Sequence, residues 1–457
     1  MEKLFGTDGI RGKVGEYPLT EGMIYKIGKS IAKYIKQLNP HNRQSQRISI
    51  AKDTRTSGDM FEEQLVKGIT AHGVDVIKLG VLPTPCSAYL VKKLNYDMGI
   101  VISASHNDID DNGIKFFTHK GYKLSLEEEI EIEQLVFSQE PDQDQAIAEE
   151  ALEGKIKEEP EAVLSYIKLL KEMLSTAKVS EYKIAADCAY GSISHLLPRA
   201  SEALGLNIAC INNQPNGENI NKECGSLHPE VIAEYVTANS LDCGFAFDGD
   251  GDRVIMCDEK GKILDGDFIL SIIAKYLFFN QKLTKDTIVA TQMSNLGLEV
   301  ALNPLGIKIV KTDVGDKYVL DRLLKSKLNV GGEQSGHIIL LDYTTTGDGL
   351  LTALFILTIM AKEKKSLSAL ARGMYKFPQI LLNIEVDKKR PLHSLPKTAK
   401  LTEKYTKKLG ASGRLYIRYS GTENKLRVMV EGQSSTEIKD IAQEIANTAK
   451  EELQCLG

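Results

Sequence analysis

The sequence contains no tryptophan, few other aromatic residues and no surplus of positive charge. Phenylalanine and tyrosine together make up 6% of the 457 residues, and the formal net charge at pH 7 is −5. Proteins that hold nucleic acid through its phosphates need a concentrated basic surface, which this composition does not supply. We therefore expect no nucleic-acid partner.

Cysteine and long apolar runs are also scarce. The seven cysteines are scattered without a C-x-x-C pair, so the sequence predicts neither a disulfide framework nor a zinc site. No apolar stretch of signal-peptide length lies near Met1. The longest apolar run, 350–361, is too short to cross a bilayer and predicts a buried helix. These features favour a cytoplasmic protein without a membrane partner.

What the chain does contain is a recurring alternation of strand-like and helix-like segments, which indicates mostly parallel sheets covered by helices. The alternation occurs three times, within residues 47–102, 183–247 and 287–330. The predicted strands are 47–51, 74–79, 97–102, 183–187, 207–211, 243–247 and 287–291. The helices predicted in the first two units are 58–71, 85–94, 194–204 and 229–238.

After residue 378 the pattern changes to three short strands and two helices, the last opened by a Ser434-x-x-Glu437 capping box. The charged segments 139–161 and 362–378 are interpreted as solvated connectors. We therefore predict an α/β fold of three similar α/β domains with mixed, mostly parallel sheets plus a smaller C-terminal α+β domain, arranged around a central cleft. The predicted domains are residues 1–150, 151–256, 257–372 and 373–457.

Polar loops follow the last strand of each α/β unit, which is where open α/β sheets bind their ligands. The loop of the first unit contains Ser105, which from its position alone is a nucleophile, a phosphate ligand or a helix cap. The loop of the third unit contains Glu333, Gln334, Ser335 and His337, a set that suits sugar hydroxyls. His337 could equally be a structural hydrogen-bonding residue.

The loop of the second unit, residues 248–253, reads Asp-Gly-Asp-Gly-Asp-Arg. The carboxylates of Asp248, Asp250 and Asp252 repel one another unless a cation lies among them. Mg²⁺ prefers few carboxylates, with its remaining positions held by phosphate or water. A polar surface turn is the alternative. An EF-hand is excluded because Arg253 stands where that loop requires glycine.

A fourth polar loop connects two predicted strands of the C-terminal domain. It contains Arg418, Ser420, Gly421 and Thr422 and is followed by Arg427. Arginine binds phosphate through paired hydrogen bonds, and hydroxyl and backbone N–H groups add donors; a solvated hairpin is the alternative. Together the four loops predict one site with a serine, a magnesium cage, sugar ligands and a phosphate clamp, which suits phosphoryl transfer.

Five motifs, in order along nearly the whole chain, resemble those of the α-D-phosphohexomutases. They are Phe-Gly-Thr-Asp-Gly-Ile-Arg-Gly at 5–12, the Ser105 loop with 112–117, and residues 248–253, 332–337 and 418–427. The first motif, Gln334 and residues 427–432 are most similar to bacterial members that interconvert glucosamine 6-phosphate and glucosamine 1-phosphate. Asp108 and Asn424 stand where the family usually has proline, and Tyr419 is an uncommon neighbour of Arg418, which predicts altered loop stiffness.

The resemblance implies a role for each matching residue. The catalytic set, with Ser105 as the phosphoserine and the others in proton transfer or charge stabilisation, is Ser105, Lys115, Arg11, His106 and Arg253. The implied ligands of Mg²⁺ are Ser105, Asp248, Asp250 and Asp252. The residues implied to bind the substrate, through its sugar hydroxyls and its non-reacting phosphate, are Glu333, Ser335, His337, Arg418, Ser420, Gly421, Thr422 and Arg427.

The implied reaction passes through a sugar 1,6-bisphosphate. The phosphoserine gives its phosphoryl group to a 6-phosphosugar, the bisphosphate turns round, and Ser105 takes the group from C6 to leave the 1-phosphate. The implied cofactors are Mg²⁺ and glucosamine (or glucose) 1,6-bisphosphate as the priming donor, and the partner is a phosphosugar substrate. The protein would be a monomer or homodimer that supplies UDP-N-acetylglucosamine for cell-wall synthesis.

Three alternative functions stay open at this point. A phosphomannomutase or phosphoglucomutase of the same superfamily would differ by a few contacts in the 333–337 loop. A non-catalytic sugar-phosphate sensor would need no nucleophile, so Ser105 and the three carboxylates weigh against it. A phosphatase-like hydrolase would release free phosphate in amounts comparable to isomer formation.

Overall fold

The protein contains four β-sheets distributed over two compact units. One unit comprises Met1–Thr291 with Val310–Ala371, and the other comprises Gln292–Ile309 with Arg372–Gly457. The computed structural model describes residues 3–6, 8–38, 46–138, 153–174, 177–420 and 424–455.

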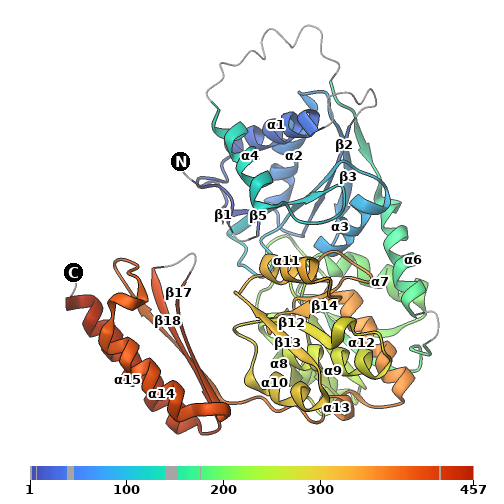
Figure 1. Ribbon diagram of the computed structural model, residues 1–457. Helices are drawn as coiled ribbons and strands as arrows, with labels where there is room; N and C mark the ends of the chain where they lie inside the picture. Colours follow the sequence, from blue (N-terminus) through green and yellow to red (C-terminus); the bar gives the residue numbers. More distant parts are fainter. Residues whose placement is uncertain are drawn as a thin grey trace. The chain divides into compact units, whose positions relative to one another are not determined.

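The first sheet has six strands in the order β1-β5-β4-β2-β3-β6. They are β1 (Ile10–Lys13), β2 (Arg47–Lys52), β3 (Asp75–Val81), β4 (Met98–Ile102), β5 (Asp111–Thr118) and β6 (Ile156–Glu158). Every residue of β4 is buried, as expected of a parallel strand covered on both faces. The helices are α1 (Glu21–Leu38), α2 (Gly58–Thr70), α3 (Thr84–Lys93) and α4 (Leu126–Phe137). Of these, α1, α2 and α4 pack together over the sheet around one apolar core (Figure 1).

The second sheet has the order β11-β10-β9-β7-β8. Its strands are β7 (Lys183–Asp187), β8 (Asn207–Ile211), β9 (Cys243–Phe247), β10 (Val254–Asp258) and β11 (Ile263–Leu264), and its helices are α6 (Val163–Leu174), α7 (Ile193–Leu204) and α8 (Pro229–Ala238).

The third sheet has the order β13-β12-β14-β15. Its strands are β12 (Thr287–Thr291), β13 (Lys308–Thr312), β14 (Val330–Gly332) and β15 (Ile338–Leu340). The helices in this region are α9 (Gly266–Phe279), α10 (Leu296–Leu302), α11 (Asp316–Ser326), α12 (Gly349–Glu363) and α13 (Leu367–Leu370).

The same strand arrangement recurs in the three α/β sheets and positions their polar loops. In each sheet a parallel strand is followed by an antiparallel neighbour, and these pairs are β4 with β5, β9 with β10, and β14 with β15. The loop between the two strands is residues 103–110 in the first sheet (the serine loop), 248–253 in the second (the acidic loop) and 333–337 in the third (the Glu333 loop). Equivalent connections therefore carry three chemically different loops.

The C-terminal domain is smaller and built differently. Its antiparallel sheet has the order β16-β18-β17, formed by β16 (Gln379–Glu385), β17 (Gly413–Tyr419) and β18 (Lys425–Gly432). Its helices are α14 (Pro396–Leu409) and α15 (Ser435–Cys455). Both helices contact the sheet and each other (Figure 1). The Ser434 hydroxyl accepts from the Glu437 N–H at 3.3 Å, which is the serine half of the predicted capping box.

These sheets confirm the predicted fold class of three α/β domains with mixed sheets and a smaller α+β domain. The predicted buried helix is α12, in which residues 349–360 are all buried. The interpretation of both charged segments as solvated connectors was wrong. The segment 362–378 contains α13, and Leu367, Ala371 and Met374 are buried. The segment 139–161 contributes β6, which adds a parallel strand to the first sheet beside β3. Its residues 139–152 lie outside the described part. Within the described residues, no helix combines the length and apolar character needed to cross a membrane.

Candidate active site

Ser105 lies fully buried in the serine loop, immediately beside the acidic loop. Its hydroxyl donates to Oδ2 of Asp248 at 2.6 Å and lies 3.3 Å from Nδ1 of His106. Its φ of 55° is in the left-handed region, which serine seldom adopts. Strained residues of this kind persist only where their surroundings hold them, and they cluster at functional sites. The loop thus presents one hydroxyl to the first carboxylate of the acidic loop.

Arg55, to which the sequence motifs assign no role, holds the serine loop in place. It follows β2, is 3% exposed, and its Nε donates to Asp53 at 3.0 Å. Its two terminal nitrogens donate to four backbone carbonyl oxygens, those of Ser105 (3.2 Å), Asn107 (2.8 Å), Asp108 (2.5 Å) and Asp111 (3.0 Å). A guanidinium offers five donors in a rigid fork, so this one side chain fixes the path of the loop.

The serine loop is held against the acidic loop by Asn221, a residue outside both loops, and by a close approach at Gly249. Asn221 donates from Nδ2 to the carbonyl oxygens of Ser105, at 2.9 Å, and Asn107, at 3.1 Å. A Cβ at Gly249 would lie 2.6 Å from the carbonyl oxygen of Ser105 and 3.0 Å from Nδ2 of Asn221. Glycine is therefore required at position 249, because any side chain would push the two loops apart.

Asp248, Asp250 and Asp252 converge in the acidic loop as a buried group of carboxylates. One oxygen from each lies within 4.8 Å of the others, and all three side chains are buried. Oδ1 of Asp250 and Oδ1 of Asp252 are buried without a hydrogen-bond partner among the described residues. Buried acceptors of this kind are costly unless a ligand satisfies them. The donor set and its unsatisfied oxygens fit a small hard cation such as Mg²⁺.

Lys115 supplies the positive charge nearest to this cluster. It lies on β5, is 1% exposed, and its Nζ is 2.7 Å from Asp250, 3.4 Å from Asp252 and 3.1 Å from Asp8. Burial alone would lower the pKa of Lys115, but these carboxylates outweigh it and raise the pKa above its ordinary value. Lys115 is therefore a permanent cation at neutral pH.

The titratable groups around Ser105 differ in the direction in which their surroundings shift their pKa values. Burial, together with the positive charges of Arg253 and Arg11, lowers the pKa of His106 to about 3, so its imidazole is neutral. Burial and the neighbouring carboxylates raise the pKa of Asp248 well above its usual range. For Asp250, the charge of Lys115 outweighs burial and lowers the pKa. Neighbouring carboxylates thus differ strongly in proton affinity, which is typical of functional sites.

Arg11 approaches the serine loop from β1. Its Nη1 donates to the carbonyl oxygen of Ala104 at 3.4 Å, and its Nη2 lies 2.5 Å from Oδ2 of Asp8. Asp8 also pairs with Lys115 and with Lys123, and these cations lower its pKa well below the usual range despite its burial. Asp8 therefore fixes three cations next to the acidic loop, although the motif analysis gave it no role.

The Glu333 loop adjoins the acidic loop through the backbone. Arg253 and His337 form an antiparallel bridge, and the N–H of Val254 donates to the carbonyl oxygen of Gly336 at 3.1 Å. Glu333 accepts from the N–H of Gly315 at 3.0 Å, and burial raises its pKa. The buried Oγ of Ser335 and Nδ1 of His337 have no hydrogen-bond partner among the residues that the structure describes. Both atoms suit contacts to a polar ligand.

Asp316, at the first turn of α11, joins this group although no sequence motif identified it. Its Oδ2 lies 3.4 Å from Nε2 of His337 and pairs with Lys123. The connections from Asp8 through Lys123 to Asp316 join three segments that are distant in sequence, and only the folded chain reveals them.

The predicted phosphate-binding residues belong to the second compact unit. Arg418 on β17 and Arg427 on β18 are directly opposite each other in the antiparallel pair, and Ser420 is buried just beyond β17. Two arginines at paired positions of neighbouring strands suit the predicted binding of a phosphate. Gly421 and Thr422 lie outside the described residues.

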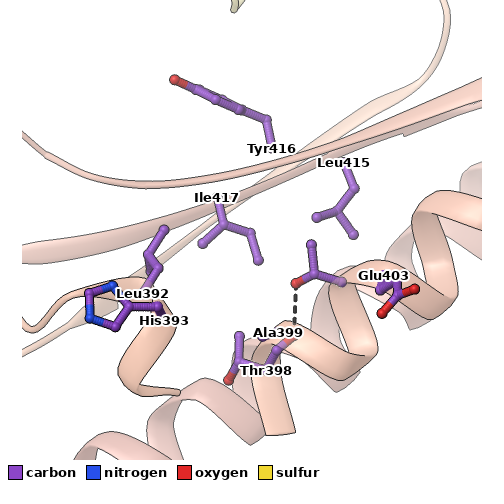
Figure 2. Close-up of a pocket in the computed structure, with 9 residues that line it drawn as sticks. Leu392, His393, Thr398, Ala399, Glu403, Leu415, Tyr416 and Ile417 are labelled. Carbon is purple, nitrogen blue, oxygen red and sulfur yellow. Dashed lines mark hydrogen bonds between the residues drawn. The ribbon is translucent and has the colours of Figure 1, made fainter. Parts of the chain in front are cut away.

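The same domain contains a cavity of about 390 Å³ on the helix side of β17 (Figure 2). Leu415 and Ile417 of the strand point toward α14, where Thr402 donates to the carbonyl oxygen of Thr398 at 2.8 Å, whereas Tyr416 points away (Figure 2). The cavity is mostly apolar and lies on the face of β17 away from the Tyr416 side chain. Side chains alternate along a strand, so Arg418, two residues from Tyr416, lies on the other face and does not line the cavity.

Family models for phosphoglucomutase/phosphomannomutase match four successive parts of the chain. The α/β/α domain I model matches residues 2–143, domain II matches 164–261, domain III matches 265–377, and the C-terminal domain model matches 381–448. Together these matches cover most of the sequence.

Individual proteins resemble the chain over its full length. A phosphoglucosamine mutase from Geobacter metallireducens is 46% identical over 454 residues, 99% of each chain. A phosphoglucomutase/phosphomannomutase family protein from Burkholderia thailandensis has a similar structure, with a TM-score of 0.79, 22% identity and coverage of 98% and 97%. The N-acetylphosphoglucosamine mutase of Aspergillus fumigatus, solved with GlcNAc-6P and magnesium, superposes with a TM-score of 0.66 at 19% identity, covering 98% and 96%. A variant of that enzyme was solved with glucose 1,6-bisphosphate.

Proposed function

We infer that this protein, which belongs to the α-D-phosphohexomutase family, interconverts glucosamine 6-phosphate and glucosamine 1-phosphate. The full-length similarity to phosphoglucosamine mutases supports this choice of substrate. The reaction would run through a phosphoserine at Ser105 and a sugar 1,6-bisphosphate, with glucosamine or glucose 1,6-bisphosphate as the priming donor. The product would feed UDP-N-acetylglucosamine synthesis in the cytoplasm, where the six described cysteines would remain free thiols, as they are here.

One observation carries the proposal. The hydroxyl of Ser105 lies 2.6 Å from Asp248, within a buried group of three carboxylates that has two oxygens without a hydrogen-bond partner among the described residues. A serine beside a cation site is suited to carry a phosphoryl group, because phosphoryl transfer depends mainly on positioning and on neutralising the transferring oxygens.

We assign Mg²⁺ to Asp248, Asp250 and Asp252, together with the phosphorylated Ser105. When bound, the ion would add positive charge beside the oxygens of the transferring group. Lys115, Arg11 and Arg253 would supply the remaining cations. Because three carboxylates raise the pKa of Lys115, we assign it charge stabilisation in preference to proton abstraction.

In the first half-reaction the bond between phosphorus and Oγ of Ser105 breaks, and a bond forms between phosphorus and a hydroxyl oxygen of the sugar. The sugar hydroxyl loses a proton and Oγ of Ser105 gains one. His106 lies 3.3 Å from Oγ and is not one of the proposed Mg²⁺ ligands, so we assign it the relay of this proton. A phosphate dianion on Ser105 would raise the pKa of the neutral His106 toward the working range.

Substrate binding would be divided between two sets of residues. Glu333, Ser335 and His337 offer a carboxylate, a hydroxyl and an imidazole to the sugar. Arg418, Ser420, Gly421, Thr422 and Arg427 would bind the phosphate that is not reacting. An amino group at C2 needs an acceptor, and the carboxylate of Glu333 or the amide oxygen of Gln334 can provide one.

The test compares glucosamine 1-phosphate, glucose 1-phosphate and mannose 1-phosphate as substrates, each with Mg²⁺ and a priming sugar bisphosphate. We expect kcat/KM to be at least tenfold higher for the amino sugar, equivalent to about 1.4 kcal/mol of transition-state discrimination. Equal or better use of the neutral sugars would move the role to glucose or mannose metabolism. Release of free phosphate at a rate comparable to isomerisation would indicate a hydrolase instead.

A further inference from the structure

The segment 344–349, Thr-Thr-Thr-Gly-Asp-Gly, connects β15 to the buried helix α12 and has no part in the reaction described above. Asp348 is the N-cap of α12: its Oδ1 accepts from the N–H of Leu351 at 2.9 Å. A carboxylate at this position also interacts favourably with the positive end of the helix. The side chain is 1% exposed, so whatever else it contacts must satisfy a buried charge.

The second hydrogen-bond partner of Asp348 comes from a different domain of the chain. The hydroxyl of Tyr166, on α6, lies 2.9 Å from Oδ1 and 2.8 Å from Oδ2 of Asp348. Tyr166 is fully buried, and its ring packs edge-on against that of Tyr89 on α3, with the ring centroids 5.9 Å apart. One buried hydrogen bond therefore joins the start of α12 to α6, and α6 in turn rests on α3.

The start of α12 is in direct contact with the acidic loop. The N–H of Gly349 donates to the carbonyl oxygen of Gly251 at 3.0 Å. A Cβ at Gly349 would lie 2.5 Å from the carbonyl oxygen of Arg253. The acidic loop is thus packed against the helix without room for a methyl group, so a small displacement of α12 must displace Gly251 and the carboxylates on either side of it.

The start of α3 holds the same loop from the other side. The N–H of Thr84 donates to the carbonyl oxygen of Asp250 at 2.9 Å, and the Thr84 hydroxyl donates to the carboxylate of Asp250. Tyr166 contacts α3 through Tyr89 and α12 through Asp348. It therefore connects the two helices whose first residues bind the acidic loop.

The same segment also supports the Glu333 loop. A Cβ at Gly347 would lie 2.4 Å from the imidazole of His337, and the N–H of Asp348 donates to the carbonyl oxygen of Ile338 at 3.2 Å. Movement of this segment would therefore disturb a sugar-binding candidate as well as the acidic loop.

We propose that Tyr166 and Asp348 are positioning residues that hold the acidic loop in the geometry required to bind Mg²⁺. The proposal rests on the metal site and reaction proposed above. Neither residue touches the ligands directly; the pair acts through Gly349 and the backbone of the acidic loop. Burial raises the pKa of Asp348 to about 7. The hydrogen bonds from Leu351 and Tyr166 act in the opposite direction and stabilise the charged carboxylate.

The test measures Mg²⁺ affinity and turnover in three variants. Tyr166→Phe removes only the hydroxyl, and Asp348→Ala removes both the cap and the acceptor, whereas Asp348→Asn keeps an acceptor for each donor. Tyr89→Phe is the matched control, because it removes a hydroxyl from the adjacent ring of the same cluster. The dissociation constant for Mg²⁺ is measured by isothermal titration calorimetry on unphosphorylated protein without substrate, and kcat and KM are measured separately.

We expect Tyr166→Phe to weaken Mg²⁺ binding five- to tenfold. At saturating Mg²⁺, kcat should fall by a similar or smaller factor, and KM for the sugar phosphate should change less than twofold. Asp348→Ala should have a larger effect, Asp348→Asn should recover most of the affinity, and Tyr89→Phe should stay within twofold of wild type. A purely structural role would lower thermal stability and leave Mg²⁺ affinity unchanged in Tyr166→Phe, and that result would overturn the proposal.

The two proposals fail in different ways. If the wild-type protein does not isomerise glucosamine phosphates but Tyr166→Phe still weakens Mg²⁺ binding, the proposed substrate is wrong and the positioning role stands. If isomerisation is confirmed and Mg²⁺ binding is equal in wild type and Tyr166→Phe, the positioning role is wrong and the proposed function stands. Should Asp348→Ala fail to fold, Tyr166→Phe decides the outcome alone.

Discussion

The serine loop and the acidic loop lie against each other but are stabilised in opposite ways. The carbonyl groups of the serine loop are bound by Arg55 and Asn221, so the loop is held without any ligand. The acidic loop instead brings together three buried carboxylates and leaves two of their oxygens without a hydrogen-bond partner among the described residues. The proposed nucleophile is thus held by other parts of the chain, whereas the acidic loop next to it has unsatisfied oxygens that fit the proposed Mg²⁺.

Removing the nucleophile should have the largest effect on activity. Ser105→Ala is expected to lower kcat/KM at least a thousandfold, because no other described hydroxyl shares the position beside Asp248. The thermal midpoint should change little, since a loop hydroxyl contributes little to the core. Ser49→Ala, on the buried strand β2, is the control and should keep full activity. Isomerase turnover above 1% in Ser105→Ala would contradict the phosphoserine assignment.

Relieving the charge repulsion in the acidic loop should separate stability from function. Asp248→Asn is expected to weaken Mg²⁺ binding at least tenfold and yet raise the thermal midpoint of the metal-free protein by roughly 1 °C. The gain, about 1 kcal/mol, arises because burial and two like charges disfavour the Asp248 carboxylate. Calorimetry in EDTA and titration with Mg²⁺ measure the two effects.

Asp258→Asn is the matched control for this prediction. Asp258 is also buried, but it accepts from the N–H groups of Lys260 and Lys262 in a turn after β10. This variant should lose stability and keep its Mg²⁺ affinity. Loss of stability in Asp248→Asn as well would show that the acidic loop is not strained by its charge.

Loosening the serine loop should reduce activity less than removing its hydroxyl. Arg55→Lys replaces a five-donor fork with a single ammonium that cannot reach four carbonyl groups at once. We expect kcat to fall roughly 10- to 100-fold and the free energy of unfolding to fall by about 2–4 kcal/mol. Arg47→Lys is the control, since Arg47 donates to the carbonyl groups of Leu94 and Asn95 away from the site. Equal losses in both variants would assign Arg55 a general structural role.

The last prediction concerns the pH dependence of stability. Asp348 has a folded-state pKa of about 7, above the ordinary value near 4 that applies to the unfolded chain. Between about pH 4 and 7 the folded state therefore binds more protons than the unfolded state, and this group lowers stability as the pH rises, by roughly 1 kcal/mol per pH unit. Asp348→Asn lacks this titration, so its thermal midpoint relative to wild type should rise by several degrees from pH 5 to 7.5. A constant difference would argue against the raised pKa.

The sequence was most informative where one short segment contains all the chemistry. The acidic loop and the serine loop follow buried strands, so their place in the fold could be predicted from hydrophobic pattern and strand order. The domain boundaries and the roles of the individual site residues stay predictions. The phosphate contacts of Gly421 and Thr422, which lie outside the described residues, stay predictions as well.

The residues missed by the sequence are those whose role depends on distant partners. Arg55 acts on carbonyl groups about 50 residues further on, and a backbone acceptor leaves no mark in the side-chain pattern. Lys123 meets Asp316 across 193 residues, and Tyr166 meets Asp348 across 182. Strand β6 was missed because its three exposed residues lack the apolar signal of a buried strand, and only its pairing with β3 identifies it.

The spacing of these contacts also sets the order in which the site can appear during protein synthesis. Arg55 and the carbonyl groups that it binds lie within residues 55–111, but Asp248 is 143 residues beyond Ser105. At 5–20 residues per second, this residue follows Ser105 by roughly 7 to 30 s. The hydrogen bond between Asp348 and Tyr166 must wait longer still. A chain that ends before residue 248 therefore has the serine but no acidic loop, so such truncated products lack part of the proposed phosphoryl-transfer site.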